Sequence, residues 1–334
     1  MASNYFVPIA ATAALSWLLT GLATRYSVRA GLVDRPGERH SHHEPTPRGG
    51  AAGLVLAMVV ATIGLTAGQL PTAWNACIVP GAVAIALLGW WDDHRSLGVG
   101  LRFVVQLAVS LYLLGCAASA GWLAGAWSGV VALVFILWMT NLYNFMDGSN
   151  GMAGLQGVYA GCALAWLFVE AGDASAALLA ALLAAACAGF LPWNLGRARV
   201  FMGDVGSLFL GFGYGAVLVY GTGSGALGLP VALMLMGVFL ADGTLTLASR
   251  VIRGERWYNA HRQHLYQRMI AHGWSHFRVA VLYQALNLLL VLPGIWVAVR
   301  FPALAWPVAI GMALFLGLGW SLMSRKFGVL AQAG

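Results

Sequence analysis

The sequence predicts an all-α, polytopic integral membrane protein that forms a single membrane-embedded domain, residues 1–334. Composition is the first observation: 60% of the residues are hydrophobic and only 9% are charged, whereas soluble domains carry about 25% charged residues. The second is length, because apolar runs of roughly 20 residues, enough to cross the hydrocarbon core, recur along the chain. The third is periodicity, because runs such as 130–139 lack the two-residue alternation of a membrane β-barrel. Together they exclude a disordered chain and a soluble enzyme with one anchor.

The apolar runs predict about 11 transmembrane helices, with 10 as the lower count. The first run follows no basic segment and carries no evident cleavage site, so we interpret it as a first span rather than a signal peptide. An odd number of spans would place the two termini on opposite sides of the membrane. In chain order, the expected spans lie near residues 5–25, 51–70, 73–91, 102–119, 122–140, 152–170, 174–193, 205–222, 229–249, 278–299 and 303–323.

The basic residues decide the expected orientation, because Lys and Arg gather on the cytoplasmic side of membrane proteins. They follow the first, third, seventh and ninth expected spans and the end of the last span. Of the 18 basic residues, only Arg300 falls on the opposite side. We therefore expect the N-terminus in the periplasm and the C-terminus in the cytoplasm. The net charge of +7 reflects the same asymmetry, so no nucleic-acid partner is expected.

The acidic residues and histidines gather on the same side, with Glu170 and Asp173 as the acidic exceptions. A channel or transporter would more often carry ionisable groups at mid-membrane. This favours an enzyme that works at the cytoplasmic surface, with a lipid-linked sugar flippase or transporter as the alternative. The cysteines lie in apolar runs without CxxC spacing, so neither a disulfide nor zinc is expected. The candidate catalytic loops are residues 26–50, 91–102, 140–151, 194–205 and 250–277.

The first two of these loops carry groups suited to phosphate or to a cation. The segment 45–50, Pro-Thr-Pro-Arg-Gly-Gly, predicts a fixed extended loop in which Arg48 suits phosphate; a plain positive-inside loop is the alternative. Asp92 and Asp93 would repel each other at a membrane edge unless a cation or a proton lies between them. Mg²⁺ with a phosphate substrate fits, as does a base with a raised pKa. A solvated helix end is the other interpretation.

The segment 141–151, Asn-Leu-Tyr-Asn-Phe-Met-Asp-Gly-Ser-Asn-Gly, gives the clearest signal. Asn141, Asn144 and Asp147 recur every three residues, so on a helix end they lie close to one face. Their oxygens are hard ligands that suit Mg²⁺, and the turn at Gly148 lets the backbone approach a ligand. A plain turn would not need three spaced polar groups at the end of an apolar run.

The last two loops add a lone carboxylate and a basic cluster. Asp204 lies where the eighth expected span begins; it could cap that helix or hold a metal over a phosphate at the helix N-terminus. His261, Arg262 and His264 form a plausible diphosphate clamp. A loop that contacts anionic lipid is the alternative, and a zinc pair lacks a third ligand nearby. The five loops together suggest a divalent cation, a diphosphate substrate and a second, lipid substrate.

In their order along the chain, these motifs resemble the polyprenyl-phosphate N-acetylhexosamine-1-phosphate transferases (glycosyltransferase family 4), which are related to phospho-N-acetylmuramoyl-pentapeptide transferase. The resemblance covers about residues 30–270. One such motif is modestly specific, whereas five in order on one membrane face are strongly specific. They are the PTPRGG loop (45–50), the Asp92-Asp93 pair, the NxxNxxDGxxG segment (141–151), FMGDxGS (201–207) and a histidine-containing last loop.

The resemblance implies a Mg²⁺-dependent transferase, with Mn²⁺ as a substitute, in the bacterial inner membrane with its active site on the cytoplasmic face. The phosphate of undecaprenyl phosphate would attack the β-phosphorus of a UDP-N-acetyl sugar, so that UMP leaves and a lipid-diphosphate sugar forms. A single displacement needs no more than a metal clamp, and we favour it over a covalent phospho-aspartate. The implied partners are the lipid bilayer, the two substrates and, as for many relatives, a second copy in a homodimer.

The same resemblance implies roles for the matched residues. Asp204 would be the main metal ligand, helped by Asn144. Asp92 and Asp93 would orient or deprotonate the lipid phosphate, and Asp147 would order its turn. The remaining matches are Arg102 as a phosphate contact; Asn150, Phe201 and Gly148 as nucleotide contacts; His261, Arg262 and His264 as diphosphate or sugar contacts; and Asn141, Thr46 and Arg48 as supporting residues.

The chain also departs from parts of the family pattern. The pentapeptide-transferring branch has adjacent histidines where this chain has His261-Arg-Gln-His264, so the chain more closely resembles the transferases that initiate O-antigen, and hence lipopolysaccharide, synthesis. Ser96 stands where some relatives have Asn or Lys. The donor stays open among N-acetylglucosamine, N-acetylfucosamine, N-acetylquinovosamine and similar sugars. A CDP-alcohol phosphotransferase is disfavoured because no spaced Asp pair follows Asp147-Gly148, and an inactive scaffold because every candidate carboxylate is present.

Overall fold

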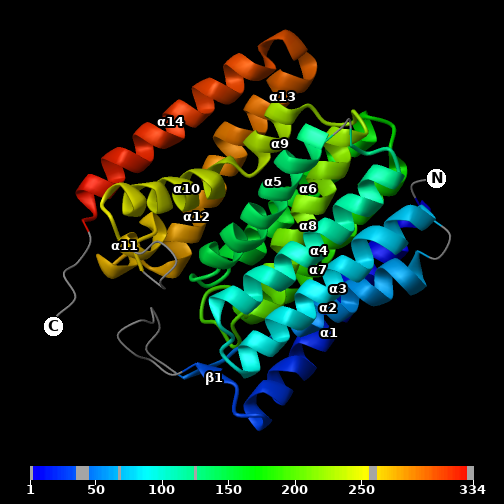
Figure 1. The fold of residues 1–334 in the computed structure, drawn as a ribbon. Helices are drawn as coiled ribbons and strands as arrows, with labels where there is room; N and C mark the ends of the chain where they lie inside the picture. The colour runs from blue at the N-terminus through cyan, green and yellow to red at the C-terminus, as the bar shows by residue number, and fades with distance from the viewer. Residues whose placement is uncertain (1–2, 35–44, 67–68, 124–125, 256–261, 329–334) are drawn as a thin grey trace.

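The structure, a computed structural model, describes residues 3–34, 45–66, 69–123, 126–255 and 262–328. They form a bundle of helices with a short two-stranded ribbon at one end (Figure 1). The first part of the chain comprises α1 (Ser3–Arg29), β1 (Val33–Asp34), β2 (Thr46–Pro47), α2 (Ala52–Val60), the π-helix η1 (Ala61–Leu65), α3 (Thr72–His94), α4 (Val99–Ser119) and α5 (Ala126–Met146). The middle part comprises α6 (Met152–Glu170), α7 (Ala174–Asn194) and α8 (Asp204–Gly223). The last part comprises α9 (Leu229–Leu235), α10 (Gly237–Ile252), α11 (Leu265–Ala271), α12 (His276–Leu286), η2 (Asn287–Val291), α13 (Leu292–Arg300), η3 (Pro302–Leu304) and α14 (Ala305–Lys326).

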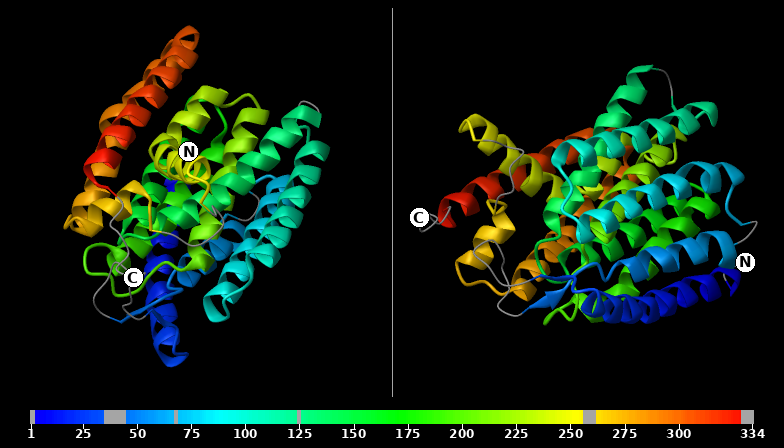
Figure 2. Two further views of the ribbon diagram at one scale, coloured as in Figure 1. Left: turned by 60° about the vertical axis from the view of Figure 1, so that its left-hand side comes forward. Right: turned by 60° about the horizontal axis from the view of Figure 1, so that its bottom comes forward.

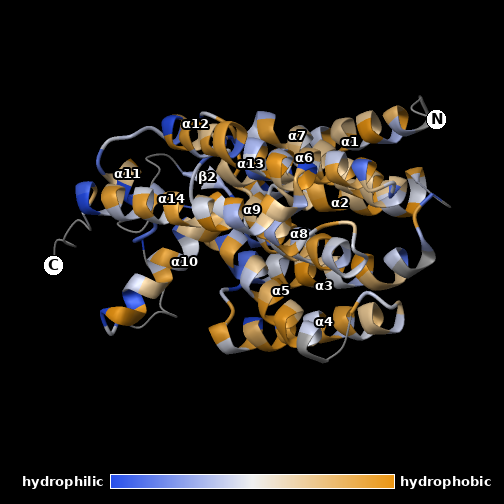
Figure 3. Ribbon diagram, turned by 90° about the horizontal axis from the view of Figure 1, so that it is seen from above, coloured by the Kyte–Doolittle hydropathy of each residue, from blue (hydrophilic) through white to orange (hydrophobic). Residues whose placement is uncertain are grey.

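The helix lengths confirm a mostly helical, polytopic membrane protein. Within the part of the chain that the structure describes, 9 helices are long and apolar enough to cross a membrane, and a bent pair brings the number to 10. Hydrophobic residues run along most of the helices (Figure 3), and many of the large ones are exposed. On α14, for example, the exposed ones include Ile310, Leu314, Phe315, Leu318 and Leu322. Such a surface suits lipid contact; the count of 11 and the orientation of the termini stay predictions.

Two expected spans differ from simple membrane helices. The run expected at 51–70 is the shorter apolar helix Ala52–Leu65, of which the last five residues form the π-helix η1. The span expected at 229–249 is not one straight helix, because α9 and α10 meet at 77°, and together they form either a broken span or a re-entrant loop. The bend lies at Met236, whose backbone leaves the helical region (φ −100°, ψ 11°), next to Gly237. Beyond it, α10 leaves the direction of the bundle (Figure 2, right).

The polar loops between the helices gather at one end of the bundle, which we call the site end. It carries the β1–β2 ribbon, in which Val33 pairs with Pro47 and Asp34 with Thr46 in antiparallel register. The turn between α5 and α6, the loop before α8 and the segment before α11 lie at the same end (Figure 1). Because the long helices from α3 to α8 alternate in direction (Figure 1), every second connection between them returns to this end.

Helix α8 lies at the centre, packed between α3 and α5, and most of its residues are buried. Two glycines let its neighbours come close. A Cβ at Gly89 of α3 would overlap the carbonyl of Asp204, the first residue of α8. A Cβ at Gly211 of α8 would lie 2.6 Å from the carbonyl oxygen of Met139 on α5. The contact at Gly89 therefore holds the end of α3, and with it the Asp92-Asp93 pair, against the start of α8.

Candidate active site

Asp93 caps α8 from a different helix. Its Oδ1 accepts the backbone N–H of Asp204 at 3.1 Å and its Oδ2 accepts that of Val205 at 3.2 Å. Its side chain is buried, so the N–H groups of α8 and the positive end of its dipole compensate for burial of the charge. The residue before the helix, Gly203, has φ +78°, and a Cβ there would lie 2.6 Å from Asp93 Oδ2. The cap that the sequence suggested for Asp204 is thus supplied by Asp93.

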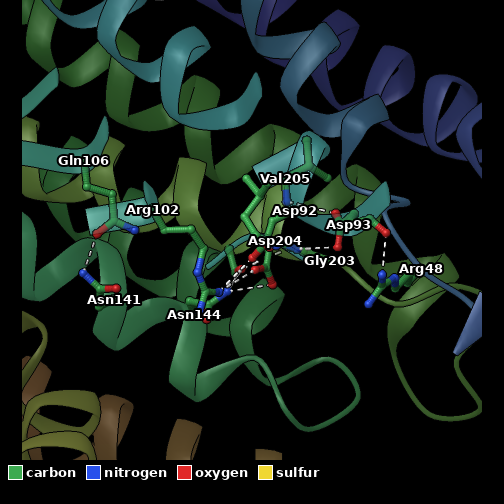
Figure 4. A network of polar contacts seen from close by, with 12 residues as sticks. Arg48, Asp92, Asp93, Arg102, Gln106, Asn141, Asn144, Gly203, Asp204 and Val205 are labelled. Atoms are coloured by element: carbon green, nitrogen blue, oxygen red, sulfur yellow. Dashed lines mark hydrogen bonds and ion pairs between the residues drawn. The ribbon is translucent and has the colours of Figure 1, made fainter. Parts of the chain in front are cut away.

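Asp92 faces the other way and pairs with Arg102 of α4. Its Oδ1 accepts the backbone N–H of Leu97 at 2.6 Å, and its Oδ2 lies 2.7 Å from Arg102 Nη1. The same Nη1 lies 3.6 Å from Asp204 Oδ2. Arg102 therefore bridges two carboxylates from different helices (Figure 4). A guanidinium in that position partly neutralises the pair and still has donors available for phosphate.

Asp204 is the most accessible of the three carboxylates, with 29% of its side chain exposed, against 8% for Asp92 and 3% for Asp93. Asn144, from the end of α5, donates from Nδ2 to Asp204 Oδ1 and to Ser207 Oγ, each at 2.9 Å. Ser207 Oγ in turn donates to the Gly203 carbonyl at 3.2 Å. The site thus combines an open carboxylate with an amide at the N-terminus of α8, where the positive end of the helix dipole favours anions.

The donor set is compatible with a magnesium ion. Asp204 and Asn144 offer carboxylate and amide oxygens, which Mg²⁺ prefers, and Mg²⁺ usually keeps several waters and needs few protein ligands. Among the described residues, no group of three or more His, Cys, Asp or Glu side chains forms a ready-made metal cage. A cation held partly by substrate phosphate therefore fits this site better than one held by protein alone.

The other predicted residues of the 141–151 segment have different surroundings. Asn141 points away from Asp204, because its Nδ2 donates to Gln106 Oε1 at 2.7 Å and to the Leu137 carbonyl at 2.8 Å. Asp147 follows the last residue of α5, and burial, followed by the charges of Asp204 and Asp93, raises its pKa well above the usual value. A carboxyl with a raised pKa stays protonated to higher pH, and can then donate a hydrogen bond.

The turn between α5 and α6 is fixed by residues that the sequence did not single out. Asn194, at the end of α7, accepts the N–H of Gly151 at 2.8 Å and donates to the Val200 carbonyl at 2.9 Å. His276 Nδ1 lies 3.1 Å from Ser149 Oγ. Asn150, a predicted nucleotide contact, donates its side-chain N–H to the Gly196 carbonyl at 2.8 Å. The only sequence signal for Asn194 is an amide at the end of an apolar run.

The PTPRGG loop packs against the segment that precedes α8. The N–H of Phe201 donates to the Pro47 carbonyl at 2.8 Å, and the N–H of Gly50 donates to the Phe201 carbonyl at 3.0 Å. Arg48 donates to the backbone carbonyl of Asp93, while the Thr46 side chain is buried. Next to this loop is a cavity of about 490 Å³ lined by Pro45, Thr46, Pro47, Arg197, Ala198 and Arg199. The PTPRGG loop therefore supports the carboxylate cluster through Asp93 and through the segment that precedes α8.

The last loop lies partly outside the described residues, and His261 is one of those left out. Arg262 is partly buried, whereas His264 is 3% exposed and lies 3.9 Å from Asp242 Oδ1. Burial lowers the pKa of His264, which favours its neutral form. Its ring stacks at 5.9 Å against both Phe145 and Tyr266. The structure thus places His264 beside the end of α5, which carries Asn144 and leads into the turn at Asp147.

The family described as glycosyl transferase family 4 matches residues 75–222, which include Asp92, Asp93, Arg102, Asn144, Asp147 and Asp204. The chain is 30% identical to the decaprenyl-phosphate N-acetylglucosaminephosphotransferase of Mycolicibacterium smegmatis, over 81% of this chain and 76% of that protein. It is 26% identical to the probable undecaprenyl-phosphate N-acetylglucosaminyl 1-phosphate transferase of Bacillus subtilis, over 79% of this chain and 76% of that protein.

The similarity also reaches a relative with a different name. The phospho-N-acetylmuramoyl-pentapeptide-transferase of Geobacillus kaustophilus is 28% identical, over 86% of this chain and 94% of that protein. The matched region contains every helix that contributes to the carboxylate cluster, from α3 to the start of α8. The motifs, their convergence at the start of α8 and the relatives agree, and the chain belongs to glycosyl transferase family 4, the family of the polyprenyl-phosphate N-acetylhexosamine-1-phosphate transferases.

Proposed function

We propose that the protein transfers an N-acetylhexosamine-1-phosphate from a UDP-sugar to undecaprenyl phosphate, which gives UMP and an undecaprenyl-diphosphate sugar. The observation that carries the proposal is the cluster of Asp92, Arg102, Asp204 and Asn144 at the N-terminus of α8. An arginine at the positive end of a helix dipole suits phosphate, and the open carboxylate suits its metal. The names of the relatives support a polyprenyl phosphate as the acceptor and an N-acetylglucosamine 1-phosphate as the transferred group.

In the proposed reaction, an oxygen of the lipid phosphate forms a bond to the β-phosphorus of the UDP-sugar. The bond from that phosphorus to the oxygen bridging to the α-phosphate breaks, and its electron pair leaves with UMP. Arg102 would bind the incoming or the transferred phosphate, because it already lies between Asp92 and Asp204. Mg²⁺, held by Asp204 and the amide oxygen of Asn144, would neutralise the negative charge of the diphosphate.

The hydrogen bonds of the two adjacent aspartates support a single displacement. Both oxygens of Asp93 accept backbone N–H groups of α8, and both oxygens of Asp92 are engaged by Leu97 and Arg102. A carboxylate that attacks phosphorus would have to give up one of these partners. We therefore assign Asp93 to holding α8 and Asp92 to orienting Arg102 and the lipid phosphate.

The site lies at one end of the bundle, which suits a lipid phosphate at the membrane surface and a nucleotide sugar from the aqueous side. The basic residues support the cytoplasmic face of a bacterial inner membrane as that side. The product would begin a lipid-linked glycan such as O-antigen, and the enzyme would work as a monomer or a homodimer. A flippase would instead need ionisable groups along a path through the bilayer.

A label-exchange assay tests the proposal. Purified protein in detergent is mixed with labelled UMP, undecaprenyl phosphate, Mg²⁺ and one of several UDP-N-acetyl sugars, and the reaction is repeated with a chelator and with Mn²⁺. We expect label to enter one UDP-sugar only when lipid and metal are both present. Exchange that continues without lipid or with chelator would contradict the mechanism, and folded protein inactive with every donor would favour the transport alternative.

A further inference from the structure

Asp242, on α10, forms an unusually large number of hydrogen bonds for a buried carboxylate. Only 2% of the residue is exposed. Oδ1 accepts the backbone N–H of Leu265 at 2.7 Å, and Oδ2 accepts that of Tyr266 at 3.3 Å. Oδ2 also accepts the hydroxyl of Tyr283 at 2.7 Å. The other donors to Oδ1 are the Thr246 hydroxyl at 3.1 Å and the Trp320 indole N–H at 3.3 Å.

These partners come from four separate elements. Leu265 and Tyr266 begin α11, Tyr283 belongs to α12 and Trp320 to α14, while Thr246 lies one turn further along α10. A buried carboxylate with this many donors is well stabilised, and loss of the charge would leave several donors without an acceptor. Asp242 therefore holds α10 after its bend and fixes the start of α11, directly after the Arg262–His264 segment.

Tyr266 connects this assembly to the carboxylate site. Its side-chain hydroxyl donates to the Phe145 carbonyl at 2.8 Å. It also lies against Gly148, where a Cβ would overlap the hydroxyl oxygen and lie 3.1 Å from the ring carbon Cζ. Phe145 directly follows Asn144, which donates to Asp204. A continuous series of contacts thus runs from Asp242 through Tyr266 to the turn between α5 and α6.

We propose that Asp242 and Tyr266 are positioning residues that set the distance between the α5–α6 turn (147–151) and the Arg262–His264 segment. This inference rests on the proposed function, together with the UDP-sugar contacts that the family resemblance implies for both segments. Neither residue touches substrate or metal in this scheme. Their effect is on the UDP-sugar donor. The lipid phosphate meets Asp92 and Arg102, and the hydrogen bonds of those two residues within the described part of the chain go to neither Asp242 nor Tyr266.

Tyr266→Phe is the sharpest test, because it keeps the ring and removes only the hydroxyl. We expect the KM for the UDP-sugar to rise about fivefold, which corresponds to one hydrogen bond, with little change in kcat or in the KM for undecaprenyl phosphate. Asp242→Asn, which keeps the shape and loses charge and acceptor capacity, should move the same KM further. An unchanged UDP-sugar KM in both variants would overturn the inference, and so would equal changes in both KM values.

Tyr220→Phe is the matched control. The Tyr220 hydroxyl also donates one hydrogen bond, in this case to the carboxylate oxygen Asp173 Oδ2 at 2.5 Å, at the end of the bundle opposite the site. This variant should lower the melting temperature as Tyr266→Phe does and leave every KM unchanged. A rise in the UDP-sugar KM as large as that of Tyr266→Phe would mean that general destabilisation explains both, and would overturn the positioning role.

A double variant and an activity-independent measurement complete the test. Gly148→Ala would force its Cβ onto the Tyr266 hydroxyl, so Gly148→Ala with Tyr266→Phe should regain part of the UDP-sugar affinity that Gly148→Ala alone loses. Absence of any such coupling would contradict the contact.

Hydrogen exchange of residues 145–151 should be faster in Tyr266→Phe than in wild-type protein or Tyr220→Phe, and unchanged exchange would overturn the inference. Hydrogen exchange needs no turnover, so it tests the positioning role separately from the proposed reaction. The label-exchange assay on wild-type protein tests that reaction alone.

Discussion

Asp93, in the last turn of α3, accepts the backbone N–H of Asp204, the first residue of α8, at 3.1 Å. Asp93 and Asp204, which lie on helices far apart in sequence, therefore meet because Asp93 caps the helix that Asp204 begins. The helix N-terminus stabilises the buried charge of Asp93, and Asp204 remains open beside it with Arg102 at 3.6 Å. This geometry underlies the different roles proposed for the carboxylates, capping for Asp93 and metal binding for Asp204, and each role can be tested by substitution.

The first prediction concerns Asp204. Asp204→Asn should abolish lipid-dependent exchange, by about a thousandfold or more, because a neutral amide is a much poorer Mg²⁺ ligand than a carboxylate. The protein should still insert and elute as the folded species in size-exclusion chromatography. Glu170→Gln, at the opposite end of the bundle, should keep nearly normal activity. Wild-type-like turnover by Asp204→Asn would refute the metal role, and a large loss in Glu170→Gln would refute the topology.

The second prediction separates capping from catalysis at Asp93. Asp93→Asn leaves one acceptor oxygen for the N–H groups of Asp204 and Val205, so we expect a stability loss of about 1 kcal/mol together with a large loss of activity. Asp173→Asn is the control, because Asp173 accepts the Ala176 N–H at 2.9 Å as the cap of α7, at the opposite end. It should show a similar thermal shift and keep its activity. If Asp93→Asn unfolds no more easily than wild type, the capping role is wrong.

The third prediction concerns the close approach of α3 to α8. Gly89→Ala would place a Cβ on the Asp204 carbonyl, so it should destabilise the protein by about 1–3 kcal/mol through overpacking and shift the Asp92-Asp93 pair. Gly115, within α4, has open space where a Cβ would lie. Gly115→Ala should therefore stabilise its helix by about 0.5–1 kcal/mol. Melting temperatures in detergent, together with label-exchange activity, distinguish Gly89→Ala from Gly115→Ala. Equal changes in melting temperature would show that α3 can move away from α8 at Gly89.

The sequence predicts much of the carboxylate cluster because its members lie at helix ends. Asp92, Asn144 and Asp204 each border an apolar run, and antiparallel packing brings alternate run ends to the same side. Their grouping therefore needs only the order of spans. The three-residue spacing predicted that Asn141 would lie with Asn144 and Asp147, but its amide instead donates a hydrogen bond to Gln106 on α4. Spacing gives the face of a helix, but the neighbouring helix decides which partner each residue meets.

The parts that escaped prediction depend on contacts between distant segments. Nothing near Met236 announces a 77° bend, because the run 229–249 is apolar enough for a straight span; α10 takes its direction from contacts of Asp242 with α11, α12 and α14. Asn194 and Tyr266 likewise act through the backbone of other segments. A single sequence shows such residues only as a polar group beside an apolar run.

The fourth prediction concerns pH and His264. Burial lowers the pKa of His264 in the folded protein, whereas an unfolded histidine titrates near pH 6.5. Above about pH 6.5 both states are neutral and the full stability is present; below it, the unfolded state binds the proton first, so stability falls as the pH falls. The melting temperature in detergent should therefore drop more between pH 7.5 and about 5.5 for the wild type than for His264→Gln. His272→Gln, at an exposed histidine, controls for the His-to-Gln replacement itself; an unchanged dependence in His264→Gln would mean that folding does not lower the pKa of His264.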